Sequence, residues 1–547
     1  MAAANDDWVA HTAAEVIALA EERYPGEAPT CASGISPSGN VHLGNLRELM
    51  TPHLVADEIR RMGRPCRHIL SWDDYDRFRR VPAGLGLPEE FAEHVGRPLT
   101  SVPDPAGDCH PNWAEHFKAP LREALKRLGV KVTEISQTQM YTSGAYIEQI
   151  ITAMRRRAEI GAVIRRYQTK KTEPDDEEEQ ADYFPFKPYC ATCGRDNTTV
   201  TAFDDATTEV TYTCACGATH GPTPIAEVAG KLVWKVDWPM RWAYEHVTFE
   251  PAGVDHSSPG SSYSVGEHLV EEIFGGKMPL HFQYSFVGTS GQAKMSSSTG
   301  GAPTPLDALE IFEAPLLRWL YARKRPSESI TLAFGDEVGR VYDEWDALTR
   351  KVADGTAVPA QAAVYTRSAS TADGKLPQTE RPLPFRTLAS VSDITAGDEE
   401  QELRILRDLT PEEPVASLDQ VRPRLDCAQA WVTEYVPAAD RTRVRERAAA
   451  ESLASLAEED RQALELLADE MGKDWSLNGL TTLLYGIPKL IRGLPMTAPP
   501  TPELKAAQRT WFILLYRLLI GKDTGPRLPT LLLALGQDKV RALISGG

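Results

Sequence analysis

The chain has 547 residues, of which 42% are hydrophobic, and a formal net charge of −18. This length is too great for one ordinary core and predicts three or four domains of a large soluble protein. No apolar run approaches the ~20 residues that a membrane span requires, and residues 1–8 carry two aspartates and no basic segment, so we expect a cytoplasmic protein without membrane partners.

The charge is not spread evenly along the chain. An acidic balance of this size counts against nucleic-acid binding unless lysines and arginines gather locally. Such groups are present, and each is either an ordinary solvated face or part of a surface that holds a defined RNA. They comprise Arg155, Arg156, Arg157, Arg165, Arg166, Lys170, Lys171, Arg323, Lys324 and Arg325.

Residues 28–72 have the pattern of a β-α-β unit. A short apolar strand over 28–33 precedes a glycine-rich turn, a helix is predicted over 46–62, and a second strand over 66–72. This arrangement is typical of a nucleotide-binding parallel sheet, whose ligands lie beyond the carboxyl ends of the strands. The 33–45 loop and the acidic residues 73–76 should therefore face one crevice.

Two short segments together predict a split ATP site. Residues 37–45 place His42 and Asn45 at the N-terminal end of a helix, which favours phosphate. Residues 293–298 place Lys294 and three serines on a glycine-flanked loop. Either segment alone occurs by chance, but the pair in this order suggests attack of a carboxylate on the α-phosphate of ATP.

The chain between about residues 77 and 230 looks like an insertion in the sheet, with amphipathic helices over 113–128 and 145–157. It contains a C-x-x-C pair and a C-x-C pair, each followed by glycine, which is the spacing of a closed, structural tetrahedral zinc site. Free thiols, a lost site, or His220 in place of one sulfur are the alternatives. The predicted ligands are Cys190, Cys193, Cys214 and Cys216.

The other cysteines (Cys31, Cys66, Cys109 and Cys427) are interpreted as isolated, buried packing residues. Eight cysteines are too few for a disulfide scaffold, so a reducing compartment is expected.

Sheet character returns after the insertion, and helices dominate the rest of the chain. Strand-like runs are interpreted over 231–237, 248–255, 266–274 and 281–287. Residues 305–350 read as helical, 353–384 are expected to include a flexible surface loop, and everything from about 388 onward reads as helices.

These patterns predict five segments. They are the first half of a catalytic domain (1–80), an insertion with a zinc module at 185–220 (81–230), the second half of the catalytic domain (231–300), a helical region with a linker (301–385) and an all-helical domain (386–547).

At this point the residues resemble a known family. The chain is similar to class I aminoacyl-tRNA synthetases, and most closely to the class I type of lysyl-tRNA synthetase, over nearly its whole length. The similarity rests on residues 33–45 with the HLGN signature, 72–77, 233–242, 250–256, 284–288, 294–298 with the KMSSS signature, 515–521 and 525–527.

The resemblance implies a Rossmann-type parallel-sheet catalytic domain with a zinc-bearing acceptor-stem insertion, followed by an all-α, helix-cage type anticodon-binding domain. It also implies an ATP site with Mg²⁺ on the phosphates. His42, Asn45 and Lys294 would be catalytic, and Lys294 would neutralise the leaving pyrophosphate. The implied ATP-binding residues are His42, Gly44, Asn45, Gly253, Asp255, Lys294, Met295, Ser296 and Ser297.

The resemblance likewise implies an amino-acid pocket, in which Asp73 takes the α-ammonium and aromatic rings wall the substrate side chain. Trp234 and Trp238 could equally be core residues of a sheet. The implied set is Gly34, Ser36, Asp73, Trp234, Trp238, His256 and Tyr284.

Two comparisons within the class bear on the substrate. Glutamyl-tRNA synthetases have an arginine just ahead of the Ser-Pro-x-Gly turn, whereas residues 31–33 here are Cys-Ala-Ser. An acidic substrate is therefore disfavoured and a cationic or neutral one favoured, and the comparison does not distinguish lysine from ornithine or a lysine analogue. Ser297 stands where the commonest class I signature has a second lysine, although serine is usual there in the class I lysyl type. Thr299 and Ala302 differ from the Lys and Asn that often follow in that type, so the loop carries less positive charge.

The expected function is therefore a monomeric lysine--tRNA ligase that uses ATP, L-lysine and tRNA(Lys). The alternatives are an adenylating ligase for another amino acid or acceptor, and a specialised or non-catalytic tRNA-binding paralogue.

Overall fold

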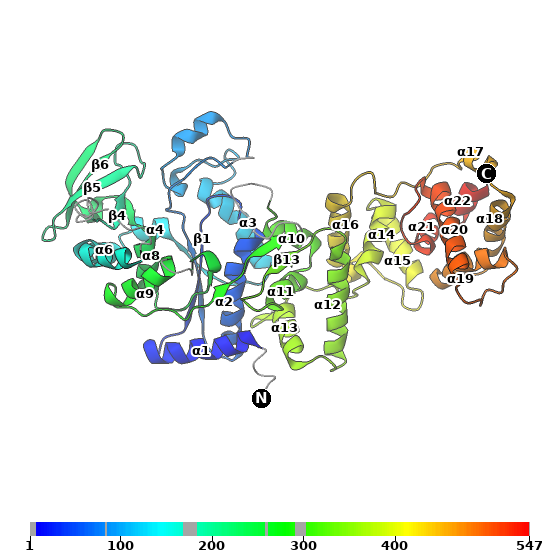
Figure 1. Cartoon of the computed structure of the whole chain (residues 1–547), viewed down its shortest axis with the longest axis horizontal. Coiled ribbons are helices and arrows are strands. Elements are labelled where there is room, and N and C mark those ends of the chain that lie inside the picture. The colour runs from blue at the N-terminus through cyan, green and yellow to red at the C-terminus, as the bar shows by residue number, and fades with distance from the viewer. Residues whose placement is uncertain (1–6, 83–84, 168–182, 257–260, 290–301, 546–547) are drawn as a thin grey trace. The chain divides into compact units, whose positions relative to one another are not determined.

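The protein is described by a computed structural model that covers residues 7–82, 85–167, 183–256, 261–289 and 302–545 (Figure 1). The chain forms two compact units. The first comprises residues 1–309, 314–333 and 348–377, and the second residues 310–313, 334–347 and 378–547. Each unit is described by itself below.

A parallel sheet is the centre of the first unit, as the sequence predicts. Its order is β3-β2-β1-β9, and all neighbouring strands are parallel. The strands are β1 Thr30–Ile35, β2 Arg67–Trp72, β3 Thr133–Ser136 and β9 Val247–Phe249. The carboxyl ends of β1 and β2 therefore lie at the same edge, where the chain continues into the polar segments 36–45 and 73–76.

Helices α1 (Trp8–Arg23) and α2 (Leu43–Arg61) pack on one face of this sheet. Cys31 of β1 is buried among their apolar side chains, and its sulfur lies 3.8 Å from that of Cys66. The prediction that these two cysteines are isolated was wrong, because parallel pairing of β1 and β2 brings their beginnings together.

Helices α8 (Trp234–Tyr244) and α9 (Ser262–Glu272) pack on the opposite face, where Ala32 joins their aromatic cluster. The sequence interpretation of a strand over 231–237 holds only for its first two residues, which belong to β8 (Gly230–Leu232), and that over 266–274 was wrong. The first segment is rich in β-branched and aromatic side chains, and such a run does not distinguish a buried helix from a strand.

The insertion carries a three-stranded antiparallel sheet of order β5-β6-β7 and a pair formed by β4 and β8. The predicted helix at 113–128 is confirmed within one residue, and that at 145–157 begins two residues later. The elements are α3 Trp113–Arg127, α4 Gln137–Thr142, α5 Ile147–Arg155, α6 Arg157–Arg166, β4 Phe186–Pro188, β5 Thr198–Phe203, β6 Glu209–Cys214, β7 Thr219–Pro224 and β8 Gly230–Leu232.

Short parallel pairs follow, β10 with β11 and β12 with β13. The 353–384 segment, expected to include a surface loop, also contains a helix and a hairpin, since its alanine-rich stretch favours a helix after Pro359. The elements are β10 Ala252–Gly253, β11 Gln283–Tyr284, β12 Val287–Thr289, α10 Pro305–Ile311, α11 Ala314–Ala322, β13 Ile330–Leu332, α12 Glu337–Ala353, α13 Pro359–Ala369, β14 Ser370–Thr371 and β15 Gly374–Lys375.

Residues from 385 onward are helical, as predicted, and the last five helices share one leucine-rich core. Across the residues that the structure describes, none of the helices combines the length and apolarity needed to cross a bilayer. The helices are α14 Phe385–Thr395, α15 Glu399–Leu409, α16 Arg424–Tyr435, α17 Ala450–Ala454, α18 Glu458–Glu470, α19 Leu477–Leu490, α20 Pro502–Ile520, α21 Leu528–Leu535 and α22 Gln537–Ser545.

Candidate active site

A cavity of about 720 Å³ opens at the carboxyl edge of the parallel sheet. Its volume is within the range of small-molecule sites, and its place beyond the strand ends is where ligands bind in such folds. The turn after β1 and the acidic segment after β2 both line it, so the predicted crevice is confirmed. All seven implied amino-acid residues line it too: Gly34, Ser36, Asp73, Trp234, Trp238, His256 and Tyr284.

His42 begins helix α2 as its N-cap. Its Nδ1 accepts the backbone N–H of Gly44 at 3.0 Å, and the Asn45 side chain accepts the backbone N–H of His42 at 3.2 Å. Because Nδ1 accepts, the neutral ring carries its proton on Nε2. Asn45 also lines the cavity. The helix end therefore combines a positive dipole with side-chain donors, which suits a phosphate.

Arg47 holds the first turns of α2 against two distant segments. Its guanidinium is buried and donates to four backbone carbonyls, those of residues 285, 325, 326 and 328, at 2.8–3.0 Å. These carbonyls lie ahead of β12 and β13. The helix end that carries His42 is thus tied to the strand that leads toward the KMSSS segment.

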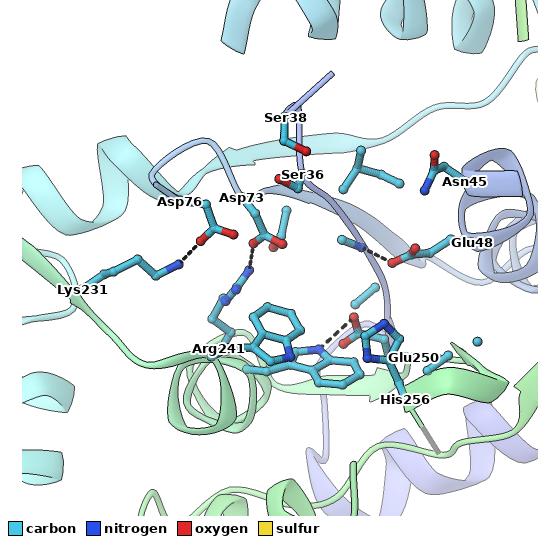
Figure 2. A pocket seen from close by; sticks show the side chains of 18 of the residues that line it. Ser36, Ser38, Asn45, Glu48, Asp73, Asp76, Lys231, Arg241, Glu250 and His256 are labelled. Atoms are coloured by element: carbon cyan, nitrogen blue, oxygen red, sulfur yellow. Dashed lines mark hydrogen bonds and ion pairs between the residues drawn. The ribbon is translucent and has the colours of Figure 1, made fainter. Parts of the chain in front are cut away.

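A network of buried charges lies on one side of the cavity. Arg241 donates to Asp73 at 2.8 Å and also to Asp237, while Lys231 pairs with Asp76 (Figure 2). Burial raises the pKa of Asp73 even with Arg241 beside it. Three carboxylates face two cations, so the network has one negative charge in excess when ionised, which suits an incoming ammonium.

Aromatic side chains and Glu250 form another wall. Trp234 and Trp238 stack at 5.1 Å between centroids, but they lie on helix α8 and not in a sheet. The two oxygens of Glu250 accept the indole N–H groups of Trp238 at 3.1 Å and Trp242 at 2.6 Å. Burial raises the pKa of the Glu250 carboxyl to about 7, against the lowering effect of the two indole donors.

The implied ATP residues are only partly described. Gly253 of β10 lines the cavity, and Asp255 lies on the short turn Val254–His256, but its side chain is outside what the structure describes. The implied residues of the KMSSS segment also lie outside the described residues: Lys294, Met295, Ser296 and Ser297.

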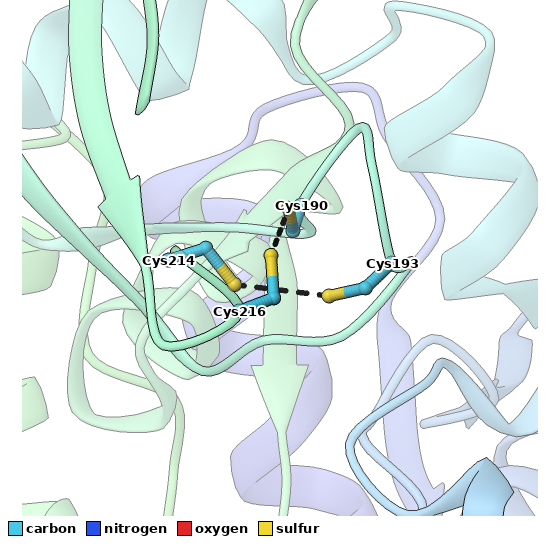
Figure 3. A group of neighbouring side chains, drawn as sticks. All are labelled: Cys190, Cys193, Cys214 and Cys216. Atoms are coloured by element: carbon cyan, nitrogen blue, oxygen red, sulfur yellow. Dashed lines mark hydrogen bonds between the residues drawn. The ribbon is translucent and has the colours of Figure 1, made fainter. Parts of the chain in front are cut away.

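The four predicted zinc ligands converge (Figure 3). The sulfurs of Cys190 and Cys216 are 3.8 Å apart, those of Cys193 and Cys214 are 3.7 Å apart, and all four lie within 4.8 Å of one another. Zn–S bonds of about 2.3 Å in a tetrahedron place sulfurs roughly 3.8 Å apart. The spacing therefore fits a tetrahedral metal ion and not a disulfide.

A second cluster of metal-ligand type lies just ahead of α3. The Cys109 sulfur is 2.9 Å from Asp104 and 3.0 Å from His110, and His116 Nδ1 is 2.9 Å from Asp104. One ligand atom from each residue lies within 4.8 Å of the others. The interpretation of Cys109 as an isolated buried residue was wrong; its signal was the Asp-x₄-Cys-His-x₅-His spacing, which a count of cysteines alone misses.

The basic groups of the insertion are largely bound within the protein. Arg155 donates to the Asp205 carbonyl, Arg157 pairs with its carboxylate, and Arg156 pairs with Glu159. Arg165 and Arg166 at the end of α6 are exposed, whereas Lys170 and Lys171 lie outside the described residues.

Several residues of the cavity were not among the predicted site residues. Glu250 and Lys231 belong to segments that were interpreted as strands, which hides which side chains point into the cavity, and Arg241 lies on helix α8, which was not predicted. Their types did carry information, since acids and bases inside apolar runs are costly to bury and so indicate a site.

A parallel sheet whose carboxyl edge combines a helix N-terminus with an acidic and aromatic cavity defines the protein as a nucleotide-binding α/β enzyme. Residues 6–372 match the family described as tRNA synthetases class I (K). This match covers more than half of the chain, and the chain belongs to that family.

Curated relatives match the full length. A lysine--tRNA ligase of Streptomyces coelicolor is 58% identical over 98% of this chain and 98% of its own, and one of Thermococcus kodakarensis is 35% identical over 97% and 98%. Among solved structures, a glutamate tRNA ligase of Elizabethkingia meningosepticum aligns at 12% identity and a TM-score of 0.45, covering 95% of this chain and 99% of that one.

Proposed function

We propose that this protein is a lysine--tRNA ligase, which activates L-lysine with ATP and transfers it to the 3′ end of tRNA(Lys). The observation that carries this proposal is the end-to-end similarity to relatives of that name, at up to 58% identity. The cavity supports it, because its acidic and aromatic lining suits a cationic amino acid with a long aliphatic stem.

In the first step, a carboxylate oxygen of lysine attacks the α-phosphorus of ATP, and the bond to the bridging oxygen breaks to release pyrophosphate. His42 and Asn45 at the start of α2 would donate to the phosphates, and Asp73 would hold the α-ammonium beside Arg241. Lys294 would neutralise the departing pyrophosphate. Positioning and charge stabilisation supply most of the rate.

In the second step, the terminal adenosine 2′-hydroxyl of the tRNA attacks the carbonyl carbon of the adenylate. AMP leaves, and the hydroxyl loses its proton. Mg²⁺ would accompany ATP and neutralise phosphate charge.

Zinc is proposed at the four-sulfur cluster, where it would hold the turns of the β5-β6-β7 module together and leave no open position. The Asp104, Cys109, His110 and His116 cluster has a donor set that suits zinc as well, so we expect up to two zinc ions per chain.

The partners follow from the same proposal. The insertion, with Arg165 and Arg166 exposed at the end of α6, would face the acceptor stem, and the helical residues 386–547 would read the anticodon. The enzyme would act as a monomer in the cytoplasm.

Exchange of labelled pyrophosphate into ATP tests the activation step. We expect exchange with lysine and at least 100-fold less with any other of the twenty amino acids, while ornithine separates the two remaining cationic candidates. A Lys294→Ala variant should lose on the order of 10²–10³-fold in kcat, by analogy with a lost oxyanion donor. Exchange with another amino acid and not with lysine would refute the proposal.

A further inference from the structure

The cavity offers several carboxylates to a cationic substrate, and most of them already face a cation of the protein. Six acidic residues line it among the described residues. Four of the six form ion pairs: Asp73 with Arg241, Asp76 with Lys231, Asp196 with Arg77 and Glu245 with Arg67. Glu48 and Glu250 complete the six.

Glu250 differs from these four in what it contacts. It follows strand β9 and is 6% exposed, and both of its side-chain hydrogen bonds come from neutral indole N–H groups, those of Trp238 and Trp242. Glu48, from helix α2, accepts the backbone N–H of Gly34 at 3.2 Å. Figure 2 shows the Glu250 carboxylate beside His256, directed into the cavity.

The surroundings of Glu250 suit an aliphatic chain. Ala32 of β1 and Ala252 of β10 belong to the same cluster as the two tryptophans, and their small side chains leave room next to the aromatic rings. Methylene groups gain by burial against such surfaces, whereas an anion there is costly unless a cation meets it. A chain with a terminal ammonium satisfies both conditions.

We propose that Glu250 is the residue that determines specificity for the substrate side chain: its carboxylate accepts the terminal ammonium of the amino acid, while Trp238 and Trp242 hold the carboxylate in place. This inference rests on the proposed activation of lysine and names the group that selects it. Asp73 and the charges around it would then bind the α-ammonium of the amino acid.

The consequence is discrimination by charge at the end of the side chain. A neutral side chain of the same length would leave the Glu250 carboxylate buried without a cation, so the site rejects it. Arg241 lowers the pKa of Glu250, but its hydrogen bonds go to Asp73 and Asp237 and not to Glu250.

The test compares lysine with 2-amino-6-hydroxyhexanoic acid, which has a hydroxyl in place of the ammonium, in pyrophosphate exchange. Glu250→Gln should lower kcat/KM for lysine by about 100-fold, as for a lost buried charge pair, and change that for the hydroxyl compound by less than about fivefold. Glu250→Asp, which keeps the charge, should recover part of the loss. Glu271→Gln removes an exposed carboxylate outside the cavity and is the matched control.

The pH dependence gives a second readout. Burial raises the pKa of this carboxyl to about 7, so it loses its charge as the pH falls through 7 and the KM for lysine should rise between pH 8 and 6. Glu250→Gln should lack this rise. The titratable or charged groups around Glu250 are Arg241, Asp73, Tyr263, His256, His281 and Glu48, and they are unchanged in the variant.

Three outcomes would overturn the inference. An equal loss for both compounds would show a purely structural role, unchanged lysine kinetics would show that the ammonium binds elsewhere, and a lysine-specific loss in Glu48→Gln but not in Glu250→Gln would assign the ammonium to Glu48. If the wild-type enzyme does not exchange pyrophosphate with lysine at all, the proposed function fails and this inference with it.

Discussion

Gly44 lies where any side chain would meet the ring of His42. A Cβ at this position would be 2.7 Å from Cε1 and 2.8 Å from Nδ1 of that ring, closer than real contacts allow. The ring would have to leave its bond to the Gly44 N–H, and the donor aimed at the phosphates would move with it.

We therefore expect Gly44→Ala to lower kcat for pyrophosphate exchange by about 10²-fold, since a misplacement of about 1 Å has costs of that order. Gly39→Ala is the matched control in the same loop, because a Cβ there meets no atom within 4 Å. Equal kinetics of the two variants would contradict the role given to the His42 ring.

The packing of helix α2 against the segments that precede strands β12 and β13 depends on one buried side chain, Arg47. Replacing it with methionine keeps much of the volume but leaves four carbonyl acceptors without their donor. We expect the free energy of unfolding of the first unit to fall by about 3–5 kcal/mol, because each buried acceptor left without a donor costs about 1–3 kcal/mol and part of this is recovered by relaxation. Urea unfolding measures this loss.

Arg64→Met is the control for Arg47, since Arg64 forms an exposed ion pair with Glu21. Exposed pairs contribute about 0–1 kcal/mol, so the change should be small. A loss for Arg47→Met no larger than that of the control would show that the carbonyls are satisfied in another way.

The two metal-ligand clusters are independent elements of the insertion. We expect about two zinc ions per purified chain, with Cys193→Ser and His116→Ala each removing one of them. Elemental analysis of the two variants and the double variant measures this. Full zinc content in Cys193→Ser would contradict the four-sulfur site.

The sequence predicts the elements that are marked by residues near one another in the chain. It fails where the same residue pattern is compatible with both a helix and a strand. The turn after β1, the Cys-x-x-Cys pair and the helices beyond residue 385 each follow from glycine, cysteine or periodic leucine positions. Residues 231–237 were misread because Trp234 and Val236 favour a strand in isolation, while packing of helix α8 on the sheet decides the matter. The ion pair of Arg241 with Asp73 could not be predicted from the sequence, because it depends on the fold.

The free energy of unfolding of the first unit should depend on pH because two of its histidines are buried. His53 Nε2 accepts a hydrogen bond from Arg318 at 2.9 Å, which only the neutral ring can do, and His68 contacts the Ser33 hydroxyl at 3.0 Å. Burial lowers the pKa of His53 well below its usual value and that of His68 to about 3.

Since these pKa values are lowered in the folded state, the stability they confer is present above about pH 6.5 and is lost as the pH falls below it. Each histidine contributes up to about 1.4 kcal/mol per pH unit. Glu250, whose folded pKa is raised to about 7 by burial, adds stability as the pH falls from about 7 to about 4.5 and so offsets one of the histidines in that part of the range. His68→Gln should flatten the pH dependence of β1 and β2 amide exchange between pH 6 and 5; an unchanged slope would contradict this assignment.

The central claim is that the whole molecule attaches lysine to one tRNA. Charging of total tRNA with each of the twenty amino acids and with ornithine, followed by sequencing of the charged tRNA, tests it most directly. The account predicts that lysine alone is attached, to tRNA(Lys) alone, and that Lys294→Ala abolishes charging. Charging with a different amino acid, or binding of tRNA without any charging, would contradict it.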